Sequence, residues 1–92
     1  MEREELSRLR GELERIDGRL LALFTERMET VERIAAVKEE LGLPVRDESR
    51  EALLLARVRE EAGPLSDEAE ALFTELLAVS RARQERRRRA KT

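Results

Sequence analysis

Residues 6–41 read LSRLRGELERIDGRLLALFTERMETVERIAAVKEEL. Leucine, isoleucine and valine recur in this stretch at alternating spacings of three and four, at positions 6, 9, 13, 16, 20 and 23 and, after a gap of eleven, at 34, 37 and 41. This spacing places them in the a and d positions of a heptad repeat, along one face of an α-helix. The sequence therefore predicts one helix from about Arg3 to Leu41, ~58 Å long at about 1.5 Å per residue.

A second helix is expected after a short loop. Gly42 and Pro44 end the first helix, and Asp47 is a suitable N-cap for the next one. Gly63 and Pro64 end this second helix near Ala62. Its apolar face is expected to carry Leu54, Leu55, Val58 and Ala62.

A third helix is expected to begin at Ser66 or Asp67, where Asp67 and Glu70 have the spacing of a capping box. Its buried stripe is expected to carry Leu72, Phe73, Leu76 and Leu77. Residues 86–92 have no apolar periodicity, so they are expected to fray or to form a linker. The fold class predicted is all-α, with one long and two shorter helices in a single domain over residues 1–92.

The long helix predicts an oligomer. A compact chain of this length has a radius of gyration of only ~12 Å by size scaling. Two helices of about 16 and 20 residues cannot cover an apolar face of ~58 Å while they also pack against each other. An intertwined homodimer in which the long helices pair is the simplest arrangement that covers it.

The composition excludes several classes of protein. The chain has no cysteine and no histidine, which excludes disulfides, thiol chemistry, Cys/His zinc sites and Ser-His-Asp or Cys-His triads. The net charge of −2 argues against nucleic-acid binding by the chain as a whole. No stretch is apolar enough to span a membrane, and the charged N-terminus MEREELSRLR is not a signal peptide, so a cytoplasmic location is expected.

Polar residues stand where the helical pattern asks for apolar ones. Arg27 takes an a position of the heptad seam, while Arg10 and Lys38 take adjacent e positions. In the third helix, the row that begins with Leu72 and Leu76 continues as Ser80 and Gln84. Each case alone has a simpler explanation, such as register setting, ion pairing or the surface end of a helix. Together they indicate a cationic hollow in an apolar interior, which favours an anionic ligand.

Spacing along the first helix limits how such a hollow is assembled. Arg27 and Lys38 are three turns apart, ~16 Å between their Cα atoms, which leaves room for a small ligand. Arg10 lies ~25 Å from Arg27 on a straight helix and reaches that ligand only from a partner subunit. Asp47, Arg50 and Glu51 share one face of the first turn of the second helix. Taken alone, these three residues are better explained by a cap with a surface ion pair.

The ordered set of segments resembles the all-helical (type II) chorismate mutase family. These segments are LRGELERIDGRLLALFTER, IAAVK, PVRDESRE and SRARQ, and they cover about residues 6–85. The resemblance implies an intertwined dimer of three-helix chains that converts chorismate to prephenate without a metal or other cofactor. Family members often occur fused to other enzymes of aromatic amino-acid biosynthesis. The resemblance therefore implies that this chain is fused to, or associates with, another enzyme of that pathway.

The resemblance also implies a role for each matching residue. Arg27 and Arg10 of the partner subunit are expected to bind the two substrate carboxylates with help from Ser80. Lys38 and Gln84 are expected to donate to the ether oxygen, with Lys38 also at a carboxylate. The ring hydroxyl is expected to be bound by Asp47 and Glu51, with Arg50 closing the site. The expected catalytic residues are thus Arg27, Lys38 and Gln84.

Two other functions fit parts of the sequence. Isochorismate pyruvate elimination is a related pericyclic activity on a similar scaffold, and the spacings do not separate it from the mutase. A helical dimerisation module without catalysis explains the heptads but leaves the cationic set unexplained. Nucleic-acid binding through RRRRAK fits less well, because the segment lacks aromatic residues for stacking.

Gln84 predicts how activity depends on pH. A carboxamide donates a hydrogen bond at any ordinary pH, whereas a carboxyl group there would first have to be protonated. We therefore expect chorismate turnover to stay flat between pH 5 and 8, as checked by initial rates in buffers of constant ionic strength. A steep loss of rate across this range would contradict the role assigned to Gln84.

Overall fold

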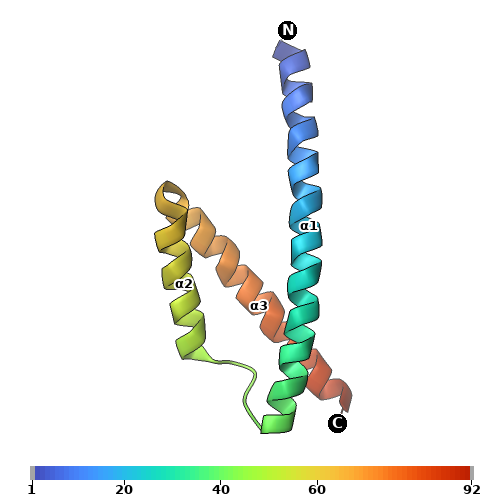
Figure 1. Cartoon of the computed structure of the whole chain (residues 1–92), viewed down its shortest axis with the longest axis vertical. Helices are drawn as coiled ribbons and strands as arrows, with labels where there is room; N and C mark the ends of the chain where they lie inside the picture. Colours follow the sequence, from blue (N-terminus) through green and yellow to red (C-terminus); the bar gives the residue numbers. More distant parts are fainter. Residues whose placement is uncertain (1, 92) are drawn as a thin grey trace. The chain divides into compact units, whose positions relative to one another are not determined.

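The computed structural model describes residues 2–91, and this part of the chain is helical throughout except for one loop. The elements in chain order are α1 (Glu2–Leu41), α2 (Glu48–Ala62), the short 3-10 helix η1 (Gly63–Leu65) and α3 (Ser66–Lys91) (Figure 1). No residue from 2 to 91 lies in a strand. The predicted all-helical class is confirmed, with bounds for α1 and α2 within one residue of those expected.

The chain divides into two compact units, and the boundary falls inside α1. The first unit, residues 1–30, contains only the N-terminal part of α1. The second unit, residues 31–92, contains the end of α1 together with α2, η1 and α3. No helix among the described residues is long and apolar enough to cross a membrane.

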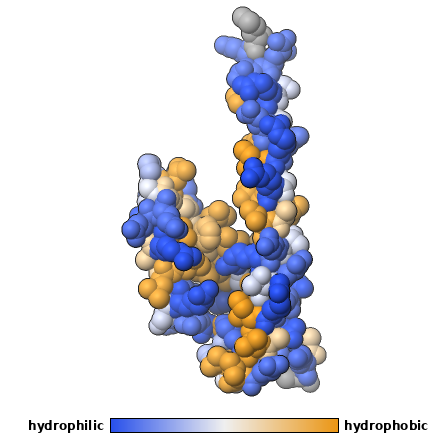
Figure 2. Space-filling model, in the orientation of Figure 1, coloured by the Kyte–Doolittle hydropathy of each residue, from blue (hydrophilic) through white to orange (hydrophobic). Residues whose placement is uncertain are grey.

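The apolar seam of the first unit is exposed in the single chain. Leu13, Leu20 and Leu23 are 56%, 55% and 61% exposed. Figure 2 shows hydrophobic residues set between hydrophilic ones along this part of α1. Burying leucines that are spaced along one helix face lowers the free energy of the system. This helix therefore presents a face suited to a partner.

In the second unit, Gly42 ends α1 through a Schellman motif. Its φ of 68° lies in the left-handed region that favours glycine. The N–H of Leu43 donates to the Lys38 carbonyl at 2.8 Å, and the N–H of Gly42 donates to the Glu39 carbonyl at 3.3 Å. These bonds satisfy the last carbonyls of α1 and turn the chain into the loop of residues 42–47.

The start of α3 differs from the predicted capping box. The chain passes from α2 through η1 into α3 without an intervening coil, and Ser66 is already helical with its N–H donating to the Gly63 carbonyl. Asp67 and Glu70 accept from Arg59 of α2, at 3.0 and 2.6 Å, instead of capping α3. The predicted capping box is wrong. The Gly63 carbonyl of η1 accepts the Ser66 N–H, and Arg59 pairs with the carboxylates of Asp67 and Glu70.

The C-terminal end also differs from the frayed tail expected for residues 86–92. The helix α3 continues through Lys91, and Thr92 lies outside the described residues. Arg87 and Lys91 both form ion pairs with Glu39 of α1, at 3.4 and 3.1 Å. These contacts fix the last turns, which carry no apolar stripe of their own.

The buried positions of the second unit are few and mostly small. They are Val31, Ala35, Val45 and Val58 among apolar residues, and Ser80 and Gln84 among polar ones. The expected face of α2 is half-buried or buried, whereas the stripe expected on α3 is wrong at Leu72, which is 56% exposed. The most buried part of α3 is therefore polar and lies two turns further along the helix.

The cap of α2 can be tested through stability. Asp47 has extended backbone angles, and its side chain accepts from the Arg50 N–H at 3.1 Å. We expect Asp47→Ala to lower the free energy of unfolding by about 1 kcal/mol, because one orphan N–H of the first turn loses its acceptor. Urea unfolding followed by circular dichroism measures the loss. The control Asp47→Asn keeps an acceptor and should stay close to wild type; an equal loss in both variants would contradict the cap.

Candidate functional site

The contact between Lys38 of α1 and Gln84 of α3 defines the site. Lys38 Nζ lies 3.4 Å from Gln84 Oε1 and 2.7 Å from the Val45 carbonyl oxygen. Lys38 is half-buried and Gln84 is only 7% exposed. Two predicted catalytic residues that are far apart in the sequence therefore meet between α1 and α3.

This contact also orients the Gln84 amide. An ammonium group donates hydrogen bonds and accepts none, so the amide oxygen must face Lys38. The amide nitrogen of Gln84 is bonded to the same carbon as this oxygen, so it adds N–H donors next to the Lys38 ammonium. Ser80 lies one turn before Gln84, is 5% exposed, and donates from its Oγ to the Leu76 carbonyl at 2.7 Å. The buried polar stretch of α3 thus carries an amide next to the Lys38 ammonium and a hydroxyl one turn earlier on the helix.

The first turn of α2 is tied to α3 by a carboxylate. Glu51, whose side chain is 16% exposed, accepts from Arg81 at 2.5 Å, with Arg46 Nε at 3.8 Å from the same oxygen. Asp47 lies on the preceding turn as the N-cap and accepts the Glu51 N–H through its backbone carbonyl at 3.1 Å. Glu51 is therefore held toward α3, whereas Asp47 and Arg50 are exposed.

Sequence reasoning missed three groups at this site. Arg81 and Arg46 both pair with Glu51, and the Val45 carbonyl accepts from Lys38. Arg81 immediately follows Ser80 in the quoted segment SRARQ, so its position on α3 was visible in the sequence. A backbone carbonyl in a loop has no sequence signal, because every residue type carries one.

The two other predicted cations belong to the first unit. Arg10 is exposed and Arg27 is half-buried on α1. Their contribution to a binding site stays a prediction. The second unit by itself supplies Lys38, Ser80 and Gln84, together with Glu51 on the adjoining helix.

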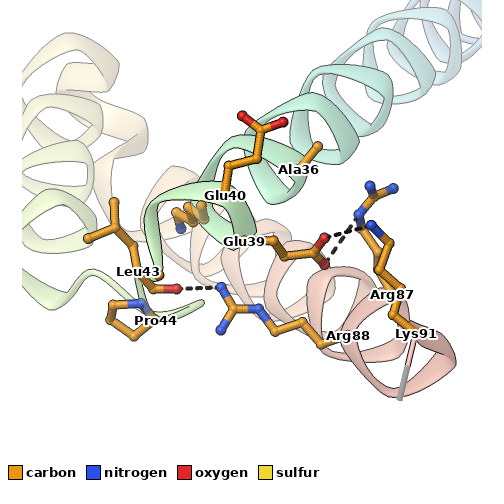
Figure 3. Close-up of a pocket in the computed structure, with 10 residues that line it drawn as sticks. Ala36, Glu39, Glu40, Leu43, Pro44, Arg87, Arg88 and Lys91 are labelled. Atoms are coloured by element: carbon orange, nitrogen blue, oxygen red, sulfur yellow. Dashed lines mark hydrogen bonds and ion pairs between the residues drawn. The ribbon is translucent and has the colours of Figure 1, made fainter.

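Two hollows adjoin the loop of residues 42–47. Both have Lys38, Leu43 and Pro44 in their walls. The smaller hollow, about 440 Å³, is completed by Arg46, Asp47, Glu48 and Ser49. The larger, about 830 Å³, lies toward the end of α3 and includes Arg87, Arg88 and Lys91 (Figure 3). Gln84 lines neither hollow, so neither pocket by itself is the predicted chamber.

Ion pairs between α1 and α3 shift two pKa values. A hydrogen bond from Arg83 is the main cause that lowers the pKa of Glu32, against partial desolvation. A hydrogen bond from Lys91 is the main cause that lowers the pKa of Glu39, again against desolvation. Both carboxylates are therefore ionised at neutral pH, and each stabilises the fold above pH 4.5. That stabilisation is lost as the pH falls through the lowered pKa.

The arrangement suits an oxygen atom that gains negative charge during a reaction. The Lys38 ammonium and the Gln84 amide both provide N–H donors and come from different helices. Donors fixed in advance, in a partly desolvated place, stabilise such an atom more than they stabilise the starting molecule. The site therefore fits electrostatic catalysis on an anionic substrate.

A comparison with known protein families matches most of the chain. The family model described as chorismate mutase type II matches residues 9–85. The match includes Arg10, Arg27, Lys38, Ser80 and Gln84, and it also includes Asp47, Arg50 and Glu51. No solved structure matches the chain significantly.

Individual relatives match shorter stretches. A chorismate mutase of Methanocaldococcus jannaschii is 34% identical over 56 residues, 61% of this chain and 57% of that protein. A T-protein of Enterobacter agglomerans is 41% identical over 61 residues, 66% of this chain and 16% of that protein. A bifunctional chorismate mutase/prephenate dehydratase of Aquifex aeolicus is 36% identical over 55 residues, 60% of this chain and 15% of that protein. The matches thus span little more than half of the first relative and about a sixth of the other two.

Proposed function

Because this chain belongs to the chorismate mutase type II family, we propose that it converts chorismate to prephenate in the biosynthesis of phenylalanine and tyrosine. The observation that carries the proposal is the contact between Lys38 and Gln84, which joins two family-type donors within the matched region. The reaction is a [3,3] rearrangement within one molecule. One C–O bond of the enol ether breaks as one C–C bond forms, and no group leaves.

The chemistry needs donors at one oxygen atom. Negative charge develops on the ether oxygen as the C–O bond breaks, so N–H donors aimed there lower the barrier. Lys38 and the Gln84 amide nitrogen take this role, with Lys38 also at a carboxylate. A rate gain of ~10⁶ corresponds to about 8 kcal/mol, and one such donor typically contributes about 3–4 kcal/mol. Two donors and selection of the reactive conformer together account for this range.

The remaining residues hold the substrate in place. Arg27 and Arg10 of the partner subunit bind the two carboxylates, for which the planar guanidinium suits paired hydrogen bonds. Ser80 assists at one carboxylate. Support for a hydroxyl site comes from Glu51, whose carboxylate is held beside the start of α2. Asp47 shares the substrate hydroxyl with Glu51, and Arg50 closes the site from the exposed side of α2.

A homodimer completes the proposed site. The exposed seam supports it, because burying one leucine contributes about 1.5–3 kcal/mol. The exposed apolar residues of the seam in the first unit are Leu6, Leu9, Leu13, Ile16, Leu20 and Leu23. A second copy matches this seam by symmetry, and it brings its own Arg10 to the site. Residues 1–92 then act as one domain within the dimer.

Association with a second enzyme is part of the proposal. The Aquifex aeolicus relative is named as bifunctional, with prephenate dehydratase beside chorismate mutase. We expect the present chain to be joined to, or to associate with, another enzyme of the aromatic pathway. Its cytoplasmic location stays a prediction.

The substitution Lys38→Ala tests the proposed chemistry. Wild-type protein should consume chorismate and release prephenate, as identified by chromatography of the products. Removing the ammonium should lower kcat/KM about 100- to 1000-fold while the dimer stays intact in size-exclusion chromatography. Unchanged turnover in Lys38→Ala would contradict the mechanism. Salicylate from isochorismate, without prephenate from chorismate, would identify the elimination reaction instead.

Mixed dimers test whether the site is shared between subunits. Arg10→Ala and Lys38→Ala should each be inactive alone. In a mixed dimer, one site carries both substitutions and the other carries neither. Unfolding and refolding the two variants together in equal amounts should therefore restore about a quarter of wild-type activity. No recovery, in mixtures shown by mass spectrometry to contain mixed dimers, would place Arg10 and Lys38 of one chain in the same site.

A further inference from the structure

Ion pairs join the end of α1 to the last turns of α3, next to the contact between Lys38 and Gln84. Glu39 pairs with Arg87 at 3.4 Å and with Lys91 at 3.1 Å. One oxygen of Glu32 accepts from Arg83, and the other lies 3.4 Å from Arg87. The acids are two turns apart on α1, and the bases follow at single turns on α3. These matched rows set the register of α3 along α1.

The facing atoms of Glu39 and Arg87 are shielded from solvent, although the two side chains are 18% and 29% exposed. Glu39 Oε1 and Arg87 Nε are both buried, and neither forms a hydrogen bond with the described residues, so the ion pair is what compensates their desolvation. Without Arg87, Lys91 still pairs with Glu39 Oε2, but the buried Oε1 loses its cationic partner, which costs more than loss of an exposed pair. This contact therefore fixes α3 more firmly than the surface ion pairs of the chain do.

Arg88 holds the loop that carries the acceptor for Lys38. It donates from Nη2 to the Leu43 carbonyl, as Figure 3 shows. The Leu43 N–H donates to the Lys38 carbonyl at 2.8 Å, and the Val45 carbonyl accepts from Lys38 Nζ at 2.7 Å. Arg88 lies one turn after Gln84 on α3. One helix thus holds Lys38 directly through Gln84 and indirectly through the loop.

We infer that Arg87 and Arg88 are positioning residues for the proposed reaction. They hold α3 and the loop where Gln84 and the Val45 carbonyl fix the Lys38 ammonium. We call Glu39, Arg87, Arg88 and Lys91 the terminal clamp. The clamp acts through Lys38 and Gln84, so its catalytic role rests on the proposed function. A misplacement of about 1 Å at a reacting group costs roughly 100-fold in rate.

The chain offers a matched control and a specific probe. Arg86 is exposed and precedes the two clamp arginines, so Arg86→Met removes the same charge from the same turn. Gln84 is the only glutamine, and the chain has no asparagine. In a ¹⁵N-labelled sample its side-chain NH₂ gives the single carboxamide pair in the NMR spectrum. Methionine substitutions add no carboxamide, so this pair reports on Gln84 in every variant.

The experiment compares Arg87→Met and Arg88→Met with Arg86→Met in the unliganded 92-residue chain. Both clamp variants should shift the Gln84 NH₂ resonances, whereas Arg86→Met should leave them at their wild-type positions. With chorismate, the clamp variants should lose roughly 10- to 100-fold in kcat with a smaller change in KM. Arg87→Lys keeps the charge and should recover part of the loss.

Two results would overturn the inference. One is a Gln84 signal that stays at its wild-type position in both clamp variants. The other is kinetics in which Arg87→Met and Arg88→Met match Arg86→Met. Circular dichroism checks that each variant is folded. If Arg87→Met loses helix content, Arg88→Met and Arg87→Lys test the inference in its place. If the wild-type chain forms no prephenate but the clamp variants show the expected NMR shifts, the proposed function is refuted. The structural role of the terminal clamp in positioning Gln84 is then still supported.

Discussion

The ammonium group of Lys38 links three segments of the second unit. Lys38 Nζ lies between the loop carbonyl of Val45 and the amide oxygen of Gln84. An ammonium can only donate, so both neighbours must present acceptors, and this fixes the amide orientation of a buried side chain. The loop, the end of α1 and the end of α3 are linked through this single group. The same group is the donor on which the proposed chemistry relies.

Long polar side chains form hydrogen bonds and ion pairs between α1 and α3 in the second unit. Its buried residues are small, and Ser80 and Gln84 are the buried positions of α3. A polar interface of this kind is costly unless its groups pair, which explains the rows of acids on α1 and bases on α3. It also leaves donors near a place where a charged substrate has to be desolvated. The positioning of the site and the stability of the helix ends therefore use the same ion pairs.

The apolar seam of α1 imposes a different constraint. Its leucines are exposed along the first unit, and exposed apolar residues in a heptad pattern favour a second helix with the same pattern. In the proposed dimer, a symmetric partner covers the seam and brings Arg10 to the site of its neighbour. In that dimer, the same association that buries the leucines also completes the proposed site. In the proposed dimer the second copy adds buried surface around the site, because one short chain buries only a limited part of its own surface.

Local rules predicted the helices, and the ordered set of segments resembled the family to which the chain belongs. The heptad spacing predicted α1, and Gly42, Asp47 and Gly63 marked helix ends, because caps and turns depend on neighbouring residues. The polar breaks at Lys38 and Gln84 were visible as exceptions to an apolar pattern, and the structure brings these two residues together. Tertiary contacts alone decided that Asp67 and Glu70 pair with Arg59, that Arg81 holds Glu51, and that residues 86–91 stay helical. A charged side chain has many partners within reach along a sequence, and only the packing of distant helices selects one.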